Sequence, residues 1–325
     1  MENKIKSTFK RDLKEEILYL LKEHPFQELA KMADEVRERF HGNVVHLRAI
    51  IEFSNYCRCN CLFCGIRRDN KKLSRYRMTP HEIITRAEKI AKEGFKTIVL
   101  QSGEDPFWTK EKLKEIISKI KKIKVAITLS VGERSYEDYA TFKDAGADRY
   151  LLKFETSDEK LFNALKPDTS LENRLRCLRW LKELGYETGS GIIVGLPAQS
   201  FESLAEDLIL MKDLRLDMVG IGPFIPHPET PLKNQPAGNP YLTLKVISLT
   251  RLLLPLSNIP ATTALAVISP SLRIRALRCG ANVIMPDMTP SGYKRLYDIY
   301  PGKTSVKGSY NELKSLLMKI NRFTL

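Results

Sequence analysis

Several features that place a protein in a membrane, in secretion or on nucleic acid are missing from this sequence. No apolar run is both uncharged and long enough to span a bilayer. The first residues, Met-Glu-Asn-Lys-Ile-Lys-Ser, lack the apolar stretch of a secretory signal. No nucleic-acid-binding motif stands out, and no linker rich in glycine, serine or proline divides the chain. We therefore expect a cytoplasmic protein of one structural unit, with neither a membrane nor a nucleic acid as partner.

Acidic residues are fewer than basic ones, which limits the class of partner. The 325 residues include 53 Lys and Arg but only 39 Asp and Glu, so the formal net charge is +14. The basic residues are spread along helices, as in 110–124, where they alternate with Glu and Ile as on a solvated helix face. Such a field favours anionic ligands or an acidic protein partner over nucleic acid.

Cysteine is scarce as well, but the six that are present include the most informative pattern of the chain. Cys57, Cys61 and Cys64 follow the spacing C-x3-C-x2-C. Three thiolates on one short loop can bind three irons of a 4Fe–4S cube and leave the fourth iron without a protein ligand. Such an open iron can chelate a small molecule and pass it one electron.

Zinc and disulfide bonds are the alternatives for these cysteines. Structural zinc usually draws on two separated pairs of ligands, and no second C-x2-C or His pair follows, although Cys59 adds a fourth thiol to the loop. A disulfide framework does not suit a chain of this length with four of its six cysteines on one loop. Cys177 and Cys279 lie in apolar helical stretches, where we expect small core residues.

Short β-branched runs alternate with amphipathic helices along the chain. The predicted strands are 46–53, 96–101, 125–130, 149–153, 187–194, 218–222, 259–264 and 282–285. The predicted helices include 12–22, 26–40, 80–92, 110–120, 137–144, 171–184, 203–214, 243–253 and 271–278. Eight β/α units predict an α/β fold, in which a parallel sheet closes into a (β/α)8 barrel of the TIM type. We expect residues 1–44 to form helices that cap the barrel, and residues 45–325 to form the barrel with a C-terminal helix.

Unusual segments follow most of the predicted strands. Barrels of this type carry their chemistry at the C-terminal ends of the strands. The cysteine loop follows the first strand, and the other segments are 101–106, 128–130, 153–156, 189–197, 220–228 and 262–263. The sequence therefore predicts one site at this end of the barrel, to which most strands contribute.

The cysteine spacing, directly after an apolar strand, resembles the radical S-adenosylmethionine (radical SAM) enzymes. In that family the open iron binds the amino and carboxylate groups of SAM, and the reduced cluster releases a 5′-deoxyadenosyl radical. Longer segments between about residues 48 and 303 resemble, more narrowly, the HydE family of FeFe-hydrogenase maturases. These segments are FSNYC (53–57), CGIRRDN (64–70), RYRMTP (75–80), TIVLQSGEDP (97–106), AGADRYLL (145–152), KPDTS (166–170), MVGIGPFIPHP (218–228) and GANVIMP (280–286).

The resemblance implies a cluster-binding and a SAM-binding set of residues. Cys57, Cys61 and Cys64 would bind the 4Fe–4S cluster, and SAM would be held by Phe63, Ser102, Gly103, Glu155, Arg174 and Tyr300. An aromatic ring such as Phe63 can stack on adenine. The planar guanidinium of Arg174 suits the SAM carboxylate. The alternative for Glu155 and Arg174 is that both are charged surface residues near the starts of helices.

The resemblance also implies a substrate cavity deeper in the barrel. Its residues would be Arg48, Thr128, Thr262 and Thr263, with Tyr297 beside the nucleoside. A charge such as that of Arg48, inside an apolar strand, is costly to bury unless it meets an anion. An outward ion pair with a helix carboxylate is the alternative for Arg48, and β-propensity alone would explain the threonines.

The reaction implied by the resemblance uses an Fe(CO)2(CN)–cysteine complex that the partner maturase HydG supplies. The radical attacks the cysteine sulfur, and the product feeds the diiron subcluster of the hydrogenase H-cluster, with HydF as a downstream partner. The tail 300–325 contains no cysteine, so no auxiliary cluster is expected there. Lys153 stands where some relatives have Arg. Lysine keeps the positive charge but lacks the planar, forked set of donors of a guanidinium.

Two other functions stay open from the sequence. One is a radical SAM mutase or synthase that acts on a small amino acid and resembles methylornithine synthase; hydrogen transfer from carbon, in place of an adenosyl–sulfur product, would identify it. The other is a non-enzymatic iron–sulfur or zinc scaffold, whose cluster would not respond to SAM.

Overall fold

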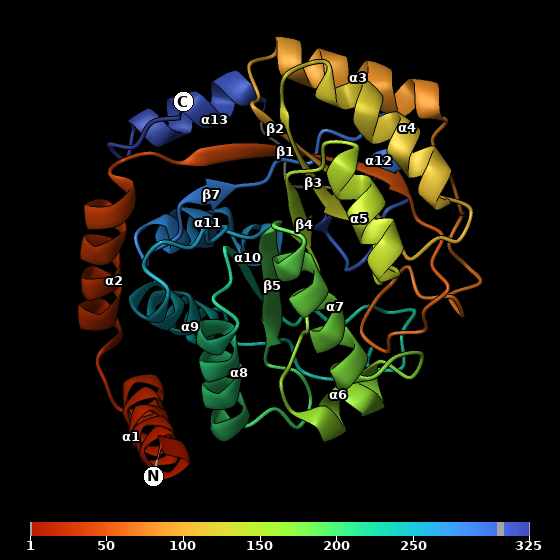
Figure 1. The fold of residues 1–325 in the computed structure, drawn as a ribbon. Coiled ribbons are helices and arrows are strands. Elements are labelled where there is room, and N and C mark those ends of the chain that lie inside the picture. Colours follow the sequence, from red (N-terminus) through yellow and green to blue (C-terminus); the bar gives the residue numbers. More distant parts are fainter. Residues whose placement is uncertain (1, 304–308, 325) are drawn as a thin grey trace.

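Seven parallel strands form one curled sheet in the computed structural model, which describes residues 2–303 and 309–324 (Figure 1). The strands are β1 (His46–Ser54), β2 (Thr97–Ser102), β3 (Ala126–Ser130), β4 (Arg149–Leu151), β5 (Glu187–Val194), β6 (Met218–Pro223) and β7 (Val283–Ile284). Their order across the sheet is β6–β5–β4–β3–β2–β1–β7. Strands β1 to β6 are therefore neighbours in sequence order, as in a succession of βαβ units.

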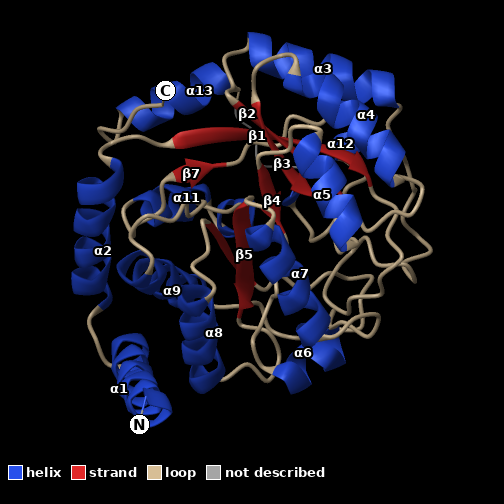
Figure 2. Cartoon of the chain, viewed as in Figure 1, coloured by secondary structure: helices blue, strands red, loops and turns tan. Residues whose placement is uncertain are grey.

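Helices cover the outer face of the sheet (Figure 2). The helices that follow β1 are α3 (Pro80–Lys92), α4 (Lys110–Lys121), α5 (Tyr136–Asp144), α6 (Glu159–Leu165), α7 (Leu171–Glu183), α8 (Phe201–Asp213), α9 (Pro240–Leu253), α10 (Thr263–Ile268), α11 (Pro270–Leu277), α12 (Ser291–Lys294) and α13 (Tyr310–Met318). At the amino-terminal side, α1 (Glu2–Lys22) packs on α8, and α2 (Phe26–His41) packs on α9. In the described part of the chain, none of the helices has the combined length and apolarity that crossing a bilayer requires.

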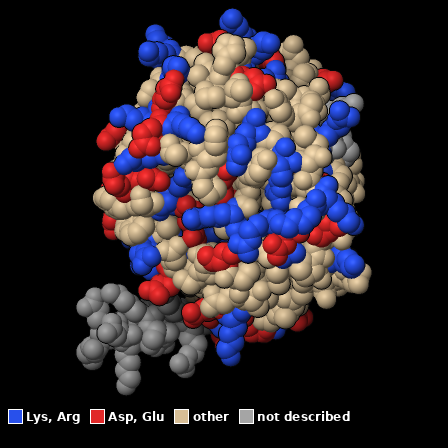
Figure 3. Space-filling view, turned by 90° about the vertical axis from the view of Figure 1, so that its right-hand side faces the viewer, with Lys and Arg blue, Asp and Glu red and all other residues tan. Residues whose placement is uncertain are grey.

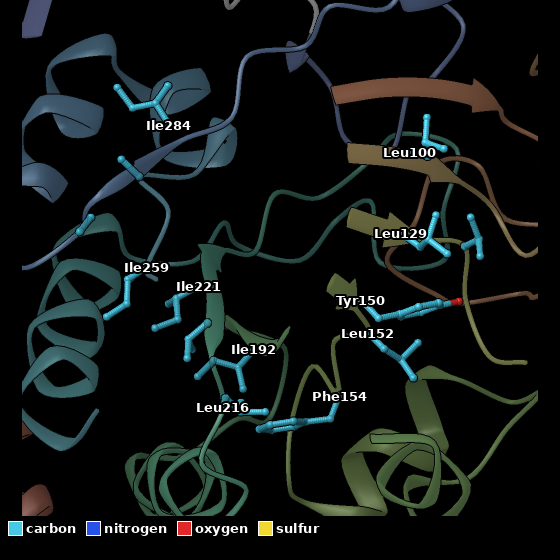
Figure 4. Packing of buried hydrophobic residues seen from close by; sticks show 14 of the residues in the cluster. Leu100, Leu129, Tyr150, Leu152, Phe154, Ile192, Leu216, Ile221, Ile259 and Ile284 are labelled. Carbon is cyan, nitrogen blue, oxygen red and sulfur yellow. The ribbon is translucent and has the colours of Figure 1, made fainter. Parts of the chain in front are cut away.

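The alternation of side chains along each strand separates the core from the barrel interior. Leu100, Leu129 and Tyr150 are register partners on β2, β3 and β4, and all three are fully buried (Figure 4). The ring of Tyr150 lies 5.0 Å from that of Tyr139 on α5, so this row faces the helices. The apolar core therefore lies between the sheet and the helices, and the intervening strand positions are left to line the interior.

The prediction of an α/β fold with a parallel sheet is confirmed, but one predicted strand is wrong. The other seven predicted strands are present, with bounds that differ by at most two residues. Residues 259–264 form no strand: Asn258 and Pro260 make single bridges to β6 and β7, and α10 begins at Thr263. Proline has no N–H to donate, so Pro260 cannot extend a regular ladder.

The segment 258–261 nevertheless joins the two edges of the sheet. The amide of Val219 on β6 donates to the carbonyl of Asn258 at 2.9 Å. The amide of Ala261 donates to the carbonyl of Val283 on β7 at 2.8 Å. The wall between β6 and β7 is thus an irregular segment held by hydrogen bonds on both sides.

Replacing Trp108 with alanine is expected to lower the free energy of unfolding by about 3–5 kcal/mol, because a deleted buried aromatic leaves a cavity. Trp108 is fully buried, and its ring meets Phe53 of β1 edge-on, with 5.1 Å between centroids. The measurement is urea-induced unfolding followed by circular dichroism. Leu256→Ala is the control, because that side chain is 72% exposed, and its effect should stay below about 0.5 kcal/mol. Equal losses in the two variants would contradict the assignment of Trp108 to the core.

Candidate active site

Inner strand residues and the loops that follow the strands enclose a cavity of about 390 Å³. This volume is within the usual range of small-molecule sites. Most of the predicted site residues line it, namely Cys57, Cys61, Phe63, Cys64, Ser102, Gly103, Glu155, Arg174, Thr262, Thr263, Tyr297 and Tyr300. Residues from the whole length of the barrel therefore meet at one place.

Arg48 and Thr128 are interior residues that do not line this cavity. Arg48 shares the inner face of β1 with Ile50 and Glu52, which do line it, but it lies nearer the amino end of the strand. Its Nη1 lies 2.8 Å from the Sδ of Met218 on β6. Burial, with the neighbouring positive charge of an arginine on β4, lowers the pKa of Arg48 to about 10.

Backbone hydrogen bonds hold the cysteine loop in place. The amides of Arg58, Leu62 and Gly65 donate to carbonyls of three separate segments, at 2.9, 2.9 and 3.0 Å. A Cβ on Gly103 would lie 2.2 Å from the carbonyl oxygen of Tyr56, so only glycine allows β2 to approach the loop this closely. The backbone therefore positions the loop through bonds that do not involve the thiols.

The thiols fit a 4Fe–4S cluster by their chemistry and their common cavity. Cys57, Cys61 and Cys64 are free thiols that line the same space, and Cys59 lines it as well. The hydrogen bond with Cys59 lowers the pKa of Cys57 to about 7, whereas burial raises the pKa of Cys64. Among the described residues, no three His, Cys, Asp or Glu side chains converge as a single metal ion requires. A cube spreads its cysteine ligands over separate irons, so the loop suits a cluster better than one ion.

Arg174 on α7 presents a buried cation with hydrogen-bonding capacity to spare. Its side chain is 4% exposed, and its Nε and Nη2 lie 2.8 Å from Glu133 and 3.7 Å from Glu104. The Nε is thus paired with Glu133, whereas Nη2 has no hydrogen-bond partner in the described part of the chain. Burial lowers the pKa of Arg174, but Glu133 and Glu104 raise it more, so the guanidinium stays charged. The site can therefore receive a carboxylate.

Glu155 is held in a conformation that L-residues rarely adopt. Its φ is +66°. Its amide donates to the carbonyl of Gly191 on β5, and its carbonyl accepts from the amide of Ile193 on the same strand. Such strain costs about 1–3 kcal/mol and persists only where the surroundings impose it. Its Oε2 lies 2.9 Å from the Nζ of Lys153. The strained backbone directs a carboxylate into the cavity, where a hydroxyl or cationic group can bind.

Asp207 on α8 anchors the loop that carries Glu155. Its carboxylate accepts hydrogen bonds from the amide and the hydroxyl of Ser157, the latter at 2.6 Å, and from the hydroxyl of Thr156 at 3.4 Å. Asp207 is fully buried, and burial raises its pKa to about 7 although these hydrogen bonds oppose the rise.

Five charged residues of the cavity were not predicted as site residues, namely Glu52, Glu104, Lys153, Lys166 and Lys303. Lys166 lies 3.3 Å from the Sγ of Cys61, and Lys303 donates to Glu52 at 2.6 Å and to Asp287 at 3.1 Å. Burial raises the pKa of Glu52 to about 8, although Lys303 opposes this. Glu52 could have been found by the argument applied to Arg48, because both are charges on the same face of an apolar strand. For Lys303 the sequence contains no comparable signal.

Comparison with known proteins agrees with this geometry. The model of the radical SAM superfamily matches residues 51–211, which include the cysteine loop. The chain is 57% identical over 298 residues to the [FeFe] hydrogenase maturase subunit HydE of Thermotoga maritima, which covers 92% of this chain and 86% of that protein. It is 31% identical over 271 residues to 3-methylornithine synthase of Methanosarcina acetivorans, at 82% and 76% coverage. A crystal structure of methylornithine synthase has a TM-score of 0.86 and 26% identity, with 96% of this chain and 94% of that chain covered.

A barrel whose first strand leads into a C-x3-C-x2-C loop, together with the superfamily match, defines a radical SAM enzyme. Within that superfamily, the chain belongs to the HydE family of FeFe-hydrogenase maturases. Membership implies a 4Fe–4S cluster and SAM as cofactors. The alternative of a non-enzymatic scaffold is therefore not retained.

The raised pKa of Asp207 predicts a specific dependence of stability on pH. The folded protein binds this proton more tightly than the unfolded chain, so the stability contributed by Asp207 is present below the ordinary pKa of 3.8 and is lost as pH rises through about 7. As pH rises across this window, the free energy of unfolding of Asp207→Asn should therefore increase relative to that of the wild type, by up to about 1.4 kcal/mol per pH unit. Urea unfolding at several pH values measures the difference.

Glu206→Gln is the matched control for Asp207→Asn, because it removes a carboxylate that is 52% exposed on the same helix. This control should show no comparable trend with pH. If the difference between Asp207→Asn and the wild type is constant with pH, Asp207 is not the titrating group.

Proposed function

We propose that this chain acts in H-cluster assembly, on an Fe(CO)2(CN)–cysteine complex, with SAM as co-substrate. The observation that carries the proposal is the 57% identity to a HydE over 92% of the chain. When bound through Cys57, Cys61 and Cys64, the 4Fe–4S cluster supplies the electron that cleaves SAM and yields a 5′-deoxyadenosyl radical. The product is proposed to contribute to the diiron subcluster.

The SAM side of the cavity is assigned to residues around the cysteine loop. Arg174 binds the SAM carboxylate through its Nη2, which lacks a hydrogen-bond partner among the described residues. Glu155 accepts from a hydroxyl or faces the sulfonium, and Phe63 stacks on the adenine. Ser102 and the backbone at Gly103 receive the amino end, since β2 brings both against the loop. Tyr300 closes the nucleoside side.

The substrate side is assigned to the wall that begins at the irregular segment between β6 and β7. Thr262 and Thr263 line the cavity there, and the buried hydroxyl of Thr262 has no hydrogen-bond partner among the described residues. Tyr297 lies on the same cavity, and the buried hydroxyl of Thr128 and the cation of Arg48 lie below it. Hydroxyl donors and a cation suit a substrate with cyanide and carboxylate groups.

Partners follow from the proposed substrate. A complex of this kind is delivered by another maturase, for which HydG is proposed, and HydF is proposed to act downstream. Lys and Arg side chains form a band across the face shown in Figure 3, with Asp and Glu among them. Together with the net charge of +14, this band favours partner surfaces that are acidic.

The decisive experiment combines anaerobically reconstituted protein, SAM and a low-potential reductant, with and without the Fe(CO)2(CN)–cysteine complex. We expect mass spectrometry to find a product with the adenosyl group on sulfur, formed only when the complex is present. If the amount of 5′-deoxyadenosine is the same with and without the complex, the protein cleaves SAM, but this substrate is rejected. Hydrogen transfer from the carbon of a small amino acid would favour the synthase alternative, for which the 31% identical relative is the basis.

Arg174→Met is expected to weaken SAM binding by about ten- to a hundredfold, because it removes charge-assisted hydrogen bonds to the carboxylate. Equilibrium dialysis with labelled SAM, on protein with a full iron content, measures the affinity. Arg176→Met is the matched control, because it removes an exposed guanidinium from the same helix. If both variants bind SAM as the wild type does, Arg174 has another role.

A further inference from the structure

Lys166 brings a buried positive charge into contact with one of the cluster-binding cysteines. It is the C-cap residue that directly follows α6, and it is 7% exposed. Its Nζ lies 3.3 Å from the Sγ of Cys61, and 5.8 Å and 5.9 Å from the ring centroids of Phe63 and Phe162. Burying an ammonium is costly unless a negative group compensates it. A thiolate at Cys61 is the group in position to do so.

The segment that carries Lys166 is fixed to the cysteine loop on both sides of Cys61. The amide of Leu62 donates to the carbonyl of Leu165 at 2.9 Å. The amide of Asn60 donates to the carboxylate of Asp168 at 2.5 Å. These bonds fix the segment on both sides of Lys166, and burial of its side chain leaves the ammonium beside the sulfur.

A fixed charge beside a ligand sulfur changes the reduction of an iron–sulfur cluster in a definite direction. Reduction adds one electron to the cluster, whose three thiolate ligands already carry negative charge. A nearby cation and an N–H···S hydrogen bond stabilise the reduced form more than the oxidised form. In a buried site the effect is large, because little water screens it.

We propose that Lys166 raises the reduction potential of the 4Fe–4S cluster and is thereby a positioning residue for electron uptake. This proposal rests on the proposed function, because it requires the cluster. Through the charge and the N–H of Lys166, the chain makes it easier for a low-potential one-electron donor to reduce the cluster. The KPDTS segment (166–170) thus has a role beyond shaping the loop.

The test is an anaerobic redox titration of reconstituted protein without SAM, followed by electron paramagnetic resonance of the reduced cluster. Lys166→Met should shift the one-electron equilibrium at least tenfold toward the oxidised form, which is 59 mV to lower potential. Lys166→Arg keeps the charge and should stay near the wild type. Lys166→Gln keeps an N–H without the charge and should fall between the two.

Arg58→Met is the matched control, because Arg58 is a cation on the same loop whose side chain is 59% exposed. Water and salt screen its charge, so the potential should change much less than in Lys166→Met. A potential that is unchanged in Lys166→Met at full iron content would overturn the proposal. An equal shift in Arg58→Met would overturn it too, because general charge would then be the cause.

Two further outcomes separate a failure of this inference from a failure of the proposed function. If Lys166→Met does not assemble a cluster, the reduction potentials of Lys166→Gln and Lys166→Arg test the proposal instead. Equal potentials in these two variants would reject the effect of charge. If the wild type itself forms no reducible cluster, the proposed function fails, and this inference fails with it.

Discussion

The backbone hydrogen bonds that position the cysteine loop are the first constraint on the geometry of the site. In this chain the loop is held by its backbone: amides at Arg58, Leu62 and Gly65 bond to three segments that come from other parts of the barrel. Each of these segments also contributes residues to the cavity. The position of the loop is therefore linked to the position of the SAM-binding and substrate-binding walls, and a displacement of any one segment would be felt at the thiols.

The second constraint is the balance of charge inside the barrel. Buried charges are tolerated when they are paired, and the cavity wall is arranged in such pairs. Glu133 and Glu104 flank Arg174, while Lys303 bonds to Glu52 on the opposite side. These pairs are incomplete, since Nη2 of Arg174 and one oxygen of Glu52 have no hydrogen-bond partner in the described part of the chain. Arg174 and Glu52 both line the cavity, where a ligand with both signs of charge can use this remaining capacity.

Much of the fold could be predicted because strands and helices leave different periods in the sequence. The strand at 259–264 could not, since its β-branched residues favour a strand while Pro260 and the start of α10 prevent one. Alternation along β1 predicts that Arg48 lies on the inner face. It does not predict how far the cavity extends toward the amino ends of the strands, and so whether Arg48 lines it. Lys166 and Lys303 are brought to the cavity by loops, and a lysine in a loop has the same appearance in the sequence whether it is buried or exposed.

The irregular segment between β6 and β7 has a consequence for how this barrel can diverge. In a regular strand, inserting or deleting one residue turns every following side chain to the opposite face, so the strand is closed to such changes. Residues 258–261 are held by single bridges instead of a continuous ladder. This seam can therefore accept a change of length while β1 to β6 keep their register. The wall that carries Thr262 and Thr263 can be reshaped for a different substrate, and the cysteine loop, which follows β1, keeps its geometry because β7 lies between β1 and this segment.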